Sequence, residues 1–211
     1  MAVFCSKQIV VPVRGKMLSD YAEGEIVKLN ESGSPVEFYV AKHDYESALN
    51  GYGRTLLVRK DCYTTGQWNS SNINAYSGST IDTWLNGNYK GLLDSKVQDV
   101  ISTTKFYYTP GNGNVTVTEL ERSIFILSCT ELNGTGVSVV GEGTALEVAS
   151  SLQIAYLNGS AVDQWTRSPN GMSTVYVFYL YSNGYANGEY CNYSKGYRPC
   201  FTIPGTALFD P

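Results

Sequence analysis

The spacing of apolar residues changes twice along this chain, and that order constrains the fold more than any other feature. In the first part, Val36, Phe38 and Val40 occupy every second position, which is the period of a half-buried strand. A shorter apolar stretch, Ile26 to Leu29, lies on the other side of the turn sequence NESGSP. The segment 24–45 is therefore predicted to form a β-hairpin, and RTLLVRKDCY after it a third strand.

Helical signals follow in the middle of the chain. Ser79 and Asp82 have the spacing of a capping box at a helix start, with apolar residues behind them at helical spacing. The segment LDSKVQDVISTTKFYYTP (93–110) is predicted to form a second helix, capped by Asp94, with Val97, Val100 and Ile101 on one face. Between this helix and the next, the unbroken apolar run SIFILSC (123–129) predicts a buried strand.

A third helix is predicted to start at the cap Thr144, with Glu147 completing its capping box. Its apolar residues recur with the spacing of one helix face, namely Ala145, Val148, Ala149 and Leu152. After residue 159 the pattern returns to strands. The sequence YSNGY predicts a hairpin whose Asn-Gly pair adopts the positive φ of a primed turn, and Cys200 to Ile203 predict a last strand.

Strands, then helices, then strands again are typical of an α+β domain built on an antiparallel sheet, with two or three helices, rather than of a doubly wound fold. The length of 211 residues suits one domain. We therefore expect a weakly patterned N-terminal arm over 1–23, with an apolar run from Ile9 to Val13, followed by one domain over 24–211.

Charge and hydropathy exclude several partners. The formal net charge is −4 and the isoelectric point is near 5.0, which argues against nucleic-acid binding because that function needs a basic face. The longest apolar run is far below the roughly 18 residues of a membrane span. The first 17 residues lack the apolar core and cleavage site of a secretory signal, so we expect none.

Cysteine and histidine leave little room for catalysis or cofactors. The five cysteines are widely spaced and odd in number, which favours reduced, packed thiols; a Cys191–Cys200 bridge between neighbouring strands is the alternative. His43 is the one histidine and is expected to be a surface or capping residue. No cluster of metal ligands and no phosphate-binding loop occurs, so no cofactor or metal is predicted.

Tyrosine is concentrated near the C-terminus. Between Tyr176 and Phe201, nine of 26 residues are aromatic, and seven of the 17 tyrosines of the chain lie there. Asn, Ser and Gly are interleaved with them. Tyrosine gives a large contact area at a low entropic cost, and Asn, Ser and Gly give adaptable hydrogen bonds, so this composition is typical of binding surfaces. An exposed tyrosine-lined sheet face without a function is the alternative.

Several segments carry a resemblance to a known family. They are QWNSSNINAYSGSTIDTWLNGNY (67–89), SIFILSCTEL (123–132), IAYLNGSAVDQWTRSP (154–169), YSNGY (181–185) and GYRPCFTIP (196–204). Together they resemble the variable proteins of diversity-generating retroelements, a prophage and gut-bacterial family with a C-type-lectin-like fold. The sequence departs from the family pattern at Gln164 and Thr166, where the family has Trp and Leu, and at Lys195, where it has an aromatic residue.

The resemblance implies a C-type-lectin-like domain over 24–211, with a variable region at about 165–200. It also implies a ligand-binding role without catalysis, at a phage tail, with a bacterial surface protein or glycan as the ligand. The arm would then join other tail components or further copies of the chain. Calcium-site motifs of sugar-binding lectins are missing from the sequence, so calcium-dependent sugar binding is not expected.

Within the variable region, Arg167, Arg198, Trp165 and Pro199 are predicted to belong to the scaffold, with each arginine fixing loop carbonyls or a carboxylate. Because only alternate residues of a strand face one side, some of the first aromatic residues must point into the core. The predicted ligand-facing residues are Tyr176, Phe178, Tyr179, Tyr181, Tyr185, Asn187, Glu189, Tyr190, Asn192, Tyr193 and Lys195.

Two other functions remain open at this level. One is an adhesion module of the same fold on a bacterial cell surface. The other is a glycan-cleaving enzyme, which would need a pair of carboxylates that the sequence does not single out.

The resemblance also implies diversification of the coding DNA at adenines. Asn, Tyr, Ser, Asp and Lys interchange through changes at adenines, and the segment 174–195 uses this set of residues heavily.

Overall fold

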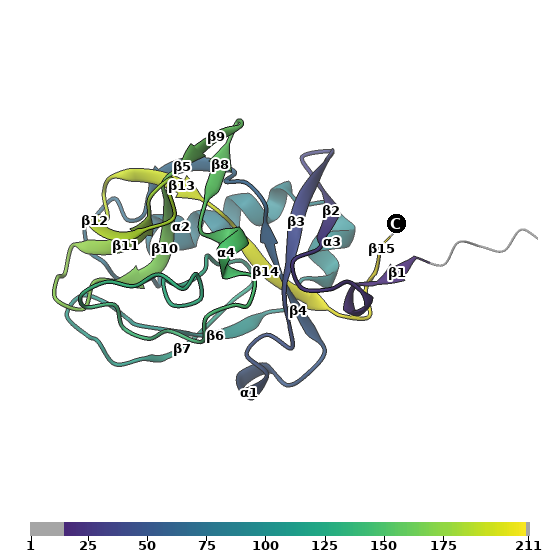
Figure 1. Cartoon of the computed structure of the whole chain (residues 1–211), viewed down its shortest axis with the longest axis horizontal. Helices are drawn as coiled ribbons and strands as arrows, with labels where there is room; N and C mark the ends of the chain where they lie inside the picture. Colours follow the sequence, from purple (N-terminus) through teal and green to yellow (C-terminus); the bar gives the residue numbers. More distant parts are fainter. Residues whose placement is uncertain (1–14, 210–211) are drawn as a thin grey trace, which may run out of the picture.

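The structure, a computed structural model, describes residues 15–209 and shows a mixed α+β fold with little helix. Two sheets form its body (Figure 1). The first is antiparallel throughout, with the order β14-β4-β3-β2. Its strands are β2 (Ile26–Glu31), β3 (Ser34–His43), β4 (Arg54–Arg59) and β14 (Cys200–Pro204).

The second sheet has five strands in the order β12-β11-β10-β13-β5. All neighbours in it are antiparallel except β10 and β13, which are parallel. Its strands are β5 (Thr64–Gln67), β10 (Gln164–Pro169), β11 (Tyr176–Leu180), β12 (Ala186–Tyr190) and β13 (Ser194–Tyr197). The predicted α+β class with mainly antiparallel sheets is thus confirmed.

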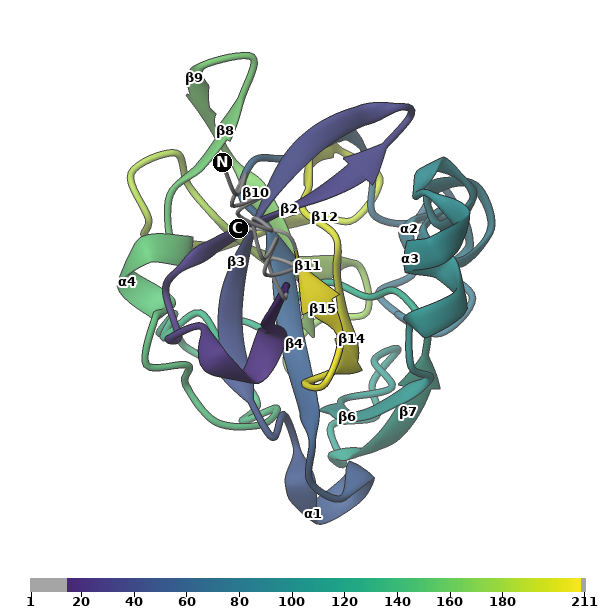
Figure 2. The ribbon, with the colours of Figure 1, turned by 90° about the vertical axis from the view of Figure 1, so that its right-hand side faces the viewer.

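Three strand pairs and a few short helices complete the described chain. The pairs are β1 (Lys16–Met17) with β15 (Leu208–Phe209), β6 (Thr104–Tyr108) with β7 (Thr118–Arg122), and β8 (Ala155–Leu157) with β9 (Ser160–Val162). The helices are α1 (Ser47–Asn50), α2 (Thr80–Trp84), α3 (Ser95–Val100) and α4 (Ala149–Leu152), with 3₁₀ turns η1 (Leu18–Asp20) and η3 (Lys90–Leu92) and a π turn η2 (Leu85–Tyr89). In Figure 2, α2 and α3 lie on one side of β4 and β14, and α4 lies on the other.

The predicted hairpin at 24–45 is confirmed, with Val27 opposite Phe38 and Leu29 opposite Val36 in its register. Two of the three predicted N-caps, Ser79 and Asp94, are also present, but the helix predicted over 93–110 ends at Val100, and 104–108 form β6 instead. The Ser79 hydroxyl accepts from the Asp82 N–H at 3.3 Å, and the Asp94 carboxylate accepts from the Lys96 N–H at 2.9 Å. These features depend on residues close together in the sequence, which is why local patterns predict them.

The helix predicted from Thr144 is wrong, because α4 includes only residues 149–152. Upstream of α4, the Leu146 N–H donates to the carbonyl of Glu131 at 3.0 Å, and Gly143 has a φ of +81°. Val148, which would lie inside the predicted helix, has a non-helical ψ of 9°. The chain is therefore anchored to a distant carbonyl and forms a loop up to α4.

The segment 123–129 is buried, as predicted, but it is not a strand. The amide side chain of Asn86 replaces a neighbouring strand: its oxygen accepts from the Ser123 and Ile124 N–H groups, and its nitrogen donates to the Ile124 carbonyl at 2.9 Å. A single bridge joins Phe125 to Cys200 of β14. Buried backbone N–H and C=O groups can therefore find hydrogen-bond partners without a neighbouring strand.

The alternative of a Cys191–Cys200 bridge is wrong: both thiols are free and buried, and so are those of Cys62 and Cys129. Burial raises the pKa of the Cys62 and Cys191 thiols to about 11.

The structure describes only part of the predicted arm at 1–23. Residues 1–14 lie outside the described residues, whereas Leu18 is completely buried in the core.

A buried ion pair connects the five-stranded sheet to the centre of the chain. Arg167 of β10 and Glu131 are both fully buried, and Nη1 of Arg167 lies 2.6 Å from Oε2 of Glu131. The same carboxylate accepts from the Tyr45 hydroxyl at 2.6 Å and from the Ser128 N–H at 2.8 Å. This confirms that Arg167 belongs to the scaffold.

Replacing Arg167 by Leu should lower the free energy of unfolding by about 3–5 kcal/mol, because the Glu131 carboxylate would stay buried without its cation. Chemical denaturation measures this change. Lys105→Met, at the exposed Lys105–Glu119 pair, is the matched control and should change stability by less than about 1 kcal/mol. Equal effects of the two substitutions would contradict the assigned role of the buried pair.

Candidate functional site

The tyrosine-rich hairpin lies at one end of the molecule, and the described chain begins and ends at the other (Figure 1). The hairpin consists of β11 and β12, joined by residues 181–185. The prediction of a hairpin at YSNGY is confirmed, but its primed Asn-Gly turn is wrong. Only Gly184 has a positive φ, +89°, and its N–H donates to the Tyr181 carbonyl at 2.8 Å.

The eleven predicted ligand-facing residues differ widely in exposure. Five of them are exposed, namely Tyr181 (38%), Tyr185 (75%), Asn187, Tyr190 (38%) and Tyr193 (54%). Four are half-buried, namely Tyr176, Glu189, Asn192 and Lys195. Phe178 and Tyr179 are buried, so their prediction as surface residues is corrected.

Both faces of β11 are covered at those two residues. On one face, the ring of Phe178 lies so close to Gly136 that a Cβ there would meet it at 3.1 Å. On the other face, Nζ of Lys195 lies 3.7 Å from the centroid of the Tyr179 ring. Burial, together with the hydrogen bond to Tyr181, raises the pKa of Tyr179 well above its ordinary value.

The exposed and half-buried tyrosines form an outer cluster of Tyr176, Tyr190 and Tyr193. Tyr176 and Tyr190 are opposite each other in the β11–β12 register, and their ring centroids are 4.6 Å apart with the rings nearly perpendicular. The rings of Tyr190 and Tyr193 are 5.8 Å apart. Such ring-to-ring contacts hold the three side chains in place.

An inner cluster surrounds Tyr179 and fixes three more of the predicted residues. Tyr181 packs edge-on against Tyr179 at 4.9 Å, and the Asn187 amide donates to the Tyr181 hydroxyl at 2.6 Å. Lys195 is paired with Asp163, Nζ to Oδ2, at 3.1 Å. Its positive charge is therefore engaged within the protein, and Lys195 supports the surface more than it presents a free charge to a ligand.

The remaining scaffold predictions are confirmed as well. Trp165 is buried, and its indole N–H donates to the Gly66 carbonyl at 3.0 Å. The guanidinium of Arg198 donates to the carbonyls of Arg59, Lys60 and Leu152 at 2.6–2.8 Å. His43, which was expected to be a surface or capping residue, is instead half-buried at the end of β3, where its ring nitrogens lie 2.9 Å from the Thr55 hydroxyl and 2.8 Å from the Tyr21 carbonyl.

Asn74 was not among the predicted residues, yet it holds the loop that leads into β11. It is fully buried, and its amide nitrogen lies 2.8 Å from the carbonyls of both Ser173 and Tyr176. Its amide oxygen accepts from the Asn112 N–H at 2.7 Å. One side chain therefore joins two loops beneath the outer tyrosine cluster.

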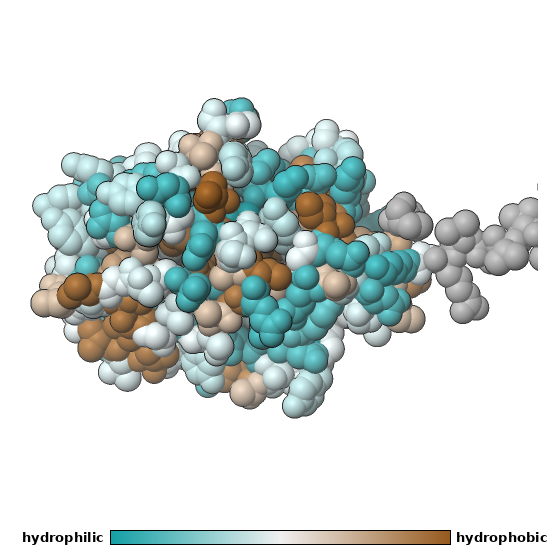
Figure 3. All heavy atoms as spheres, in the orientation of Figure 1, coloured by the Kyte–Doolittle hydropathy of each residue, from teal (hydrophilic) through white to brown (hydrophobic). Residues whose placement is uncertain are grey.

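Apolar side chains extend the surface beyond the tyrosines. Val137 and Met172 are 86% and 80% exposed, and Val115 is 48% exposed. Figure 3 shows hydrophobic side chains gathered at this end of the molecule. The loops 109–118 and 132–141 and the segment 168–188 contain no Asp, Glu, Lys or Arg. That lack of charge was visible in the sequence and could have indicated the apolar part of the surface.

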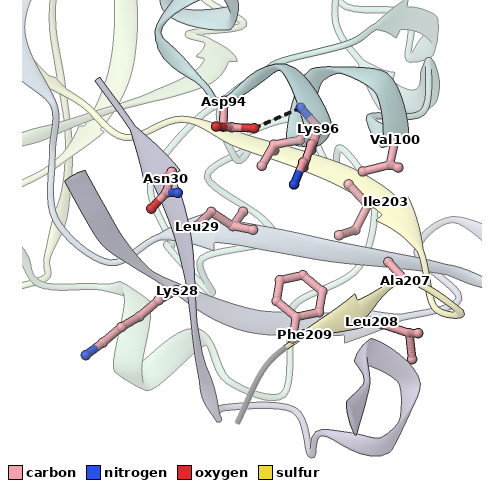
Figure 4. A pocket seen from close by; sticks show the side chains of 11 residues that line it. Lys28, Leu29, Asn30, Asp94, Lys96, Val100, Ile203, Ala207, Leu208 and Phe209 are labelled. Carbon is pink, nitrogen blue, oxygen red and sulfur yellow. Dashed lines mark hydrogen bonds between the residues drawn. The ribbon is translucent and has the colours of Figure 1, made fainter. Parts of the chain in front are cut away.

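A groove of about 470 Å³ lies away from the hairpin, beside the ends of the described chain (Figure 4). It is formed by β2, α3, β14 and β15, and its apolar lining includes Leu29, Ile203 and Phe209. Lys28, Asp94 and Lys96 also line it. None of the eleven predicted residues takes part in this groove.

Within residues 15–209, no group of three or more His, Cys, Asp and Glu side chains is arranged to hold a metal ion. Over the same residues, no helix has the length and apolar character to cross a membrane.

A family model described as "Domain of unknown function (DUF6273)" matches residues 52–205, which is well over half of the chain. The match includes the tyrosine-rich hairpin, all five strands of the second sheet, and β4 and β14 of the first. Neither a curated protein nor a solved structure shows a significant match.

Replacing Asn74 by Ala should destabilise the protein by about 3 kcal/mol, because two carbonyls and one N–H would lose their buried partner. Hydrogen–deuterium exchange should increase first in residues 170–180. Asn88→Ala, at an exposed asparagine in the π turn, should change stability by less than about 0.5 kcal/mol. Unchanged exchange at 170–180 in the Asn74 variant would disprove its role in holding this loop.

Proposed function

We propose that this chain, which belongs to the DUF6273 family, is a ligand-binding protein that displays a tyrosine-rich surface on a C-type-lectin-like scaffold. In this proposal it is a non-enzymatic receptor-binding component of a phage tail, and its ligand is a protein or glycan of the bacterial surface. The observation that carries the proposal is the exposure of Tyr181, Tyr185, Tyr190 and Tyr193 on one hairpin and the loop after it.

Exposed tyrosines in this number are unusual for a surface without a partner. Each ring brings a large apolar contact area and a hydroxyl that can donate and accept, and only two side-chain torsions are fixed on binding. The neighbouring side chains of Val137 and Met172 add exposed apolar surface. Exposed apolar and aromatic surface gathered at one end of a domain marks interaction sites.

The residues that hold the hairpin in place are different from the residues that it exposes. Arg167, Trp165 and Arg198 are buried and bond to groups inside the protein. The exposed tyrosines contribute little to those contacts. Such a division would let side chains on the hairpin change without loss of the fold, as diversification of the region would require.

The position of the chain ends supports attachment at the far side of the molecule. Residue 15 and residue 209 lie together, because β1 pairs with β15, at the end opposite the hairpin (Figure 1). We propose that the N-terminal segment connects the domain to other tail components or to further copies of the chain. Several copies would raise the overall avidity for a cell surface even if a single site binds weakly.

Replacing Tyr185, Tyr190 and Tyr193 together by Ala should weaken binding to the host bacterial cells by at least about 100-fold, because exposed aromatic anchors dominate interface energies. A cell-binding assay with labelled protein measures this. The control is Tyr52→Ala, which removes an 84% exposed tyrosine between α1 and β4 and should bind like the wild type. A folded triple variant that binds with full affinity would exclude this surface.

The proposal of diversification has its own test in the neighbouring DNA. We expect a reverse-transcriptase gene and a near-copy of the final coding segment, with differences confined to adenines in the template. The differing codons should correspond to exposed positions of the hairpin. Sequencing of the locus in several isolates decides the question, and a locus without either element would leave a fixed binding domain.

A further inference from the structure

A small polar pocket lies at the tip of the hairpin, where residues 183–186 approach α4 and the loop after Cys129. Its volume is about 360 Å³, within the range of small-molecule sites. It is lined by Asn133, Gly134, Thr135, Gln153, Asn183, Gly184, Tyr185 and Ala186.

Close backbone packing forms one side of this pocket. A Cβ at Gly184 would lie 3.3 Å from Cβ of Gln153, and one at Gly134 would lie 3.2 Å from Cβ of Ala186 and 2.7 Å from Sγ of Cys129. The hairpin tip therefore rests directly on the chain beside α4. Larger side chains at the two glycines would occupy the space, so the pocket depends on them.

The polar groups around the pocket are uncharged and incompletely used. The Gln153 amide nitrogen donates to the Leu132 carbonyl at 3.1 Å, which leaves the amide oxygen as a free acceptor. The Asn183 amide oxygen accepts from the Tyr185 N–H at 3.3 Å, which leaves its NH₂ group as a free donor. The side chains of Asn133 and Thr135 make no hydrogen bond within the described residues and can both donate and accept.

Two charged residues beside the hairpin, Asp163 and Lys195, are paired with each other. Asp163 accepts from the Ser182 N–H at 3.0 Å and binds Lys195 at 3.1 Å. No Asp, Glu, Lys or Arg lines the pocket. A charged ligand would lose its hydration there without a compensating partner, so the pocket favours a neutral one.

We propose that this pocket binds a neutral saccharide, with the ring of Tyr185 as one wall. Sugar hydroxyls donate and accept at once, and they match a ring of amides and a hydroxyl with free donors and acceptors of both kinds. The C–H face of a sugar matches an aromatic ring that is 75% exposed. This inference rests on the proposed function, since it names the ligand class for one end of the same surface.

The test is a titration of the full chain with glucose, galactose, mannose and N-acetylglucosamine, followed by NMR of the backbone amides. At least one sugar should shift the amides of residues 133–135 and 183–186 with a dissociation constant in the millimolar range. Asn133→Gly should weaken this binding by about tenfold. Glycine suits the position because Asn133 has a φ of +53°.

The matched control is Asn158→Gly, at an exposed asparagine with a φ of +52° in the β8–β9 turn, and it should leave sugar binding unchanged. Absence of shifts in the pocket with all four sugars would overturn the proposal. Shifts there with the uncharged peptide N-acetyl-triglycine amide, and not with the sugars, would also overturn it and assign the pocket to a peptide.

This outcome is separable from that of the proposed function. Loss of cell binding in the triple tyrosine variant, together with no sugar binding, would keep the tyrosine surface and reject the saccharide. Sugar binding at the pocket, together with full cell binding by the triple variant, would keep the pocket and reject the wider surface.

Discussion

The buried guanidinium of Arg167 is the interaction on which the arrangement of this protein depends. It donates to the Tyr107 and Ile126 carbonyls at 3.0 and 3.1 Å and to the Glu131 carboxylate, and it lies 4.7 Å from the centroid of the Phe106 ring. Burial opposes its charge, but the neighbouring carboxylate of Glu131 raises the pKa of Arg167. The group therefore stays charged and fixes β10 to three other parts of the chain.

Contacts of β10 with its neighbouring strands also fix the position of the tyrosine-rich hairpin. Trp165 of the same strand is opposite Tyr179 in the register, and Lys195 of β13 lies over the Tyr179 ring. Glu142 holds the loop after Cys129 on this strand, since its carboxylate accepts from the Ser168 hydroxyl and the Thr109 N–H, both at 2.5 Å. The exposed tyrosines are thus the outermost layer over a support that is complete without them, which makes their replacement compatible with the same fold.

Patterns in the sequence predicted the features that depend on near neighbours. The hairpin at 26–43, the caps at Ser79 and Asp94 and the hairpin at 176–190 all follow from residues a few positions apart. The helix predicted at Thr144 failed because the chain before α4 follows a distant segment, with the Leu146 amide bonded to the Glu131 carbonyl and with a non-helical ψ of 9° at Val148. The strand predicted at 123–129 failed because its backbone groups bond to scattered partners, such as the Asn86 side chain at residues 123 and 124 and the Ser168 hydroxyl at Cys129.

Only part of the candidate surface was predictable, because the sequence pattern does not report contacts between distant residues. Composition located the tyrosines, but strand alternation could not separate buried from exposed rings, because both faces of β11 are covered at Phe178 and Tyr179. The role of Asn74 and the pocket at Asn133 and Gln153 depend on contacts between residues far apart in the sequence. No local pattern identifies such contacts.

The most direct test of the account is a comparison of two libraries displayed on yeast and sorted for resistance to protease. One library randomises the exposed positions Tyr181, Tyr185, Tyr190 and Tyr193, and the other randomises the buried positions Trp165, Phe178 and Tyr179. If the buried residues support the fold independently of the exposed tyrosines, most members of the first library should stay folded, with little preference for tyrosine. The second library should retain only large apolar or aromatic residues. Equal depletion of both libraries, or a requirement for tyrosine at the exposed positions in the absence of any ligand, would contradict it.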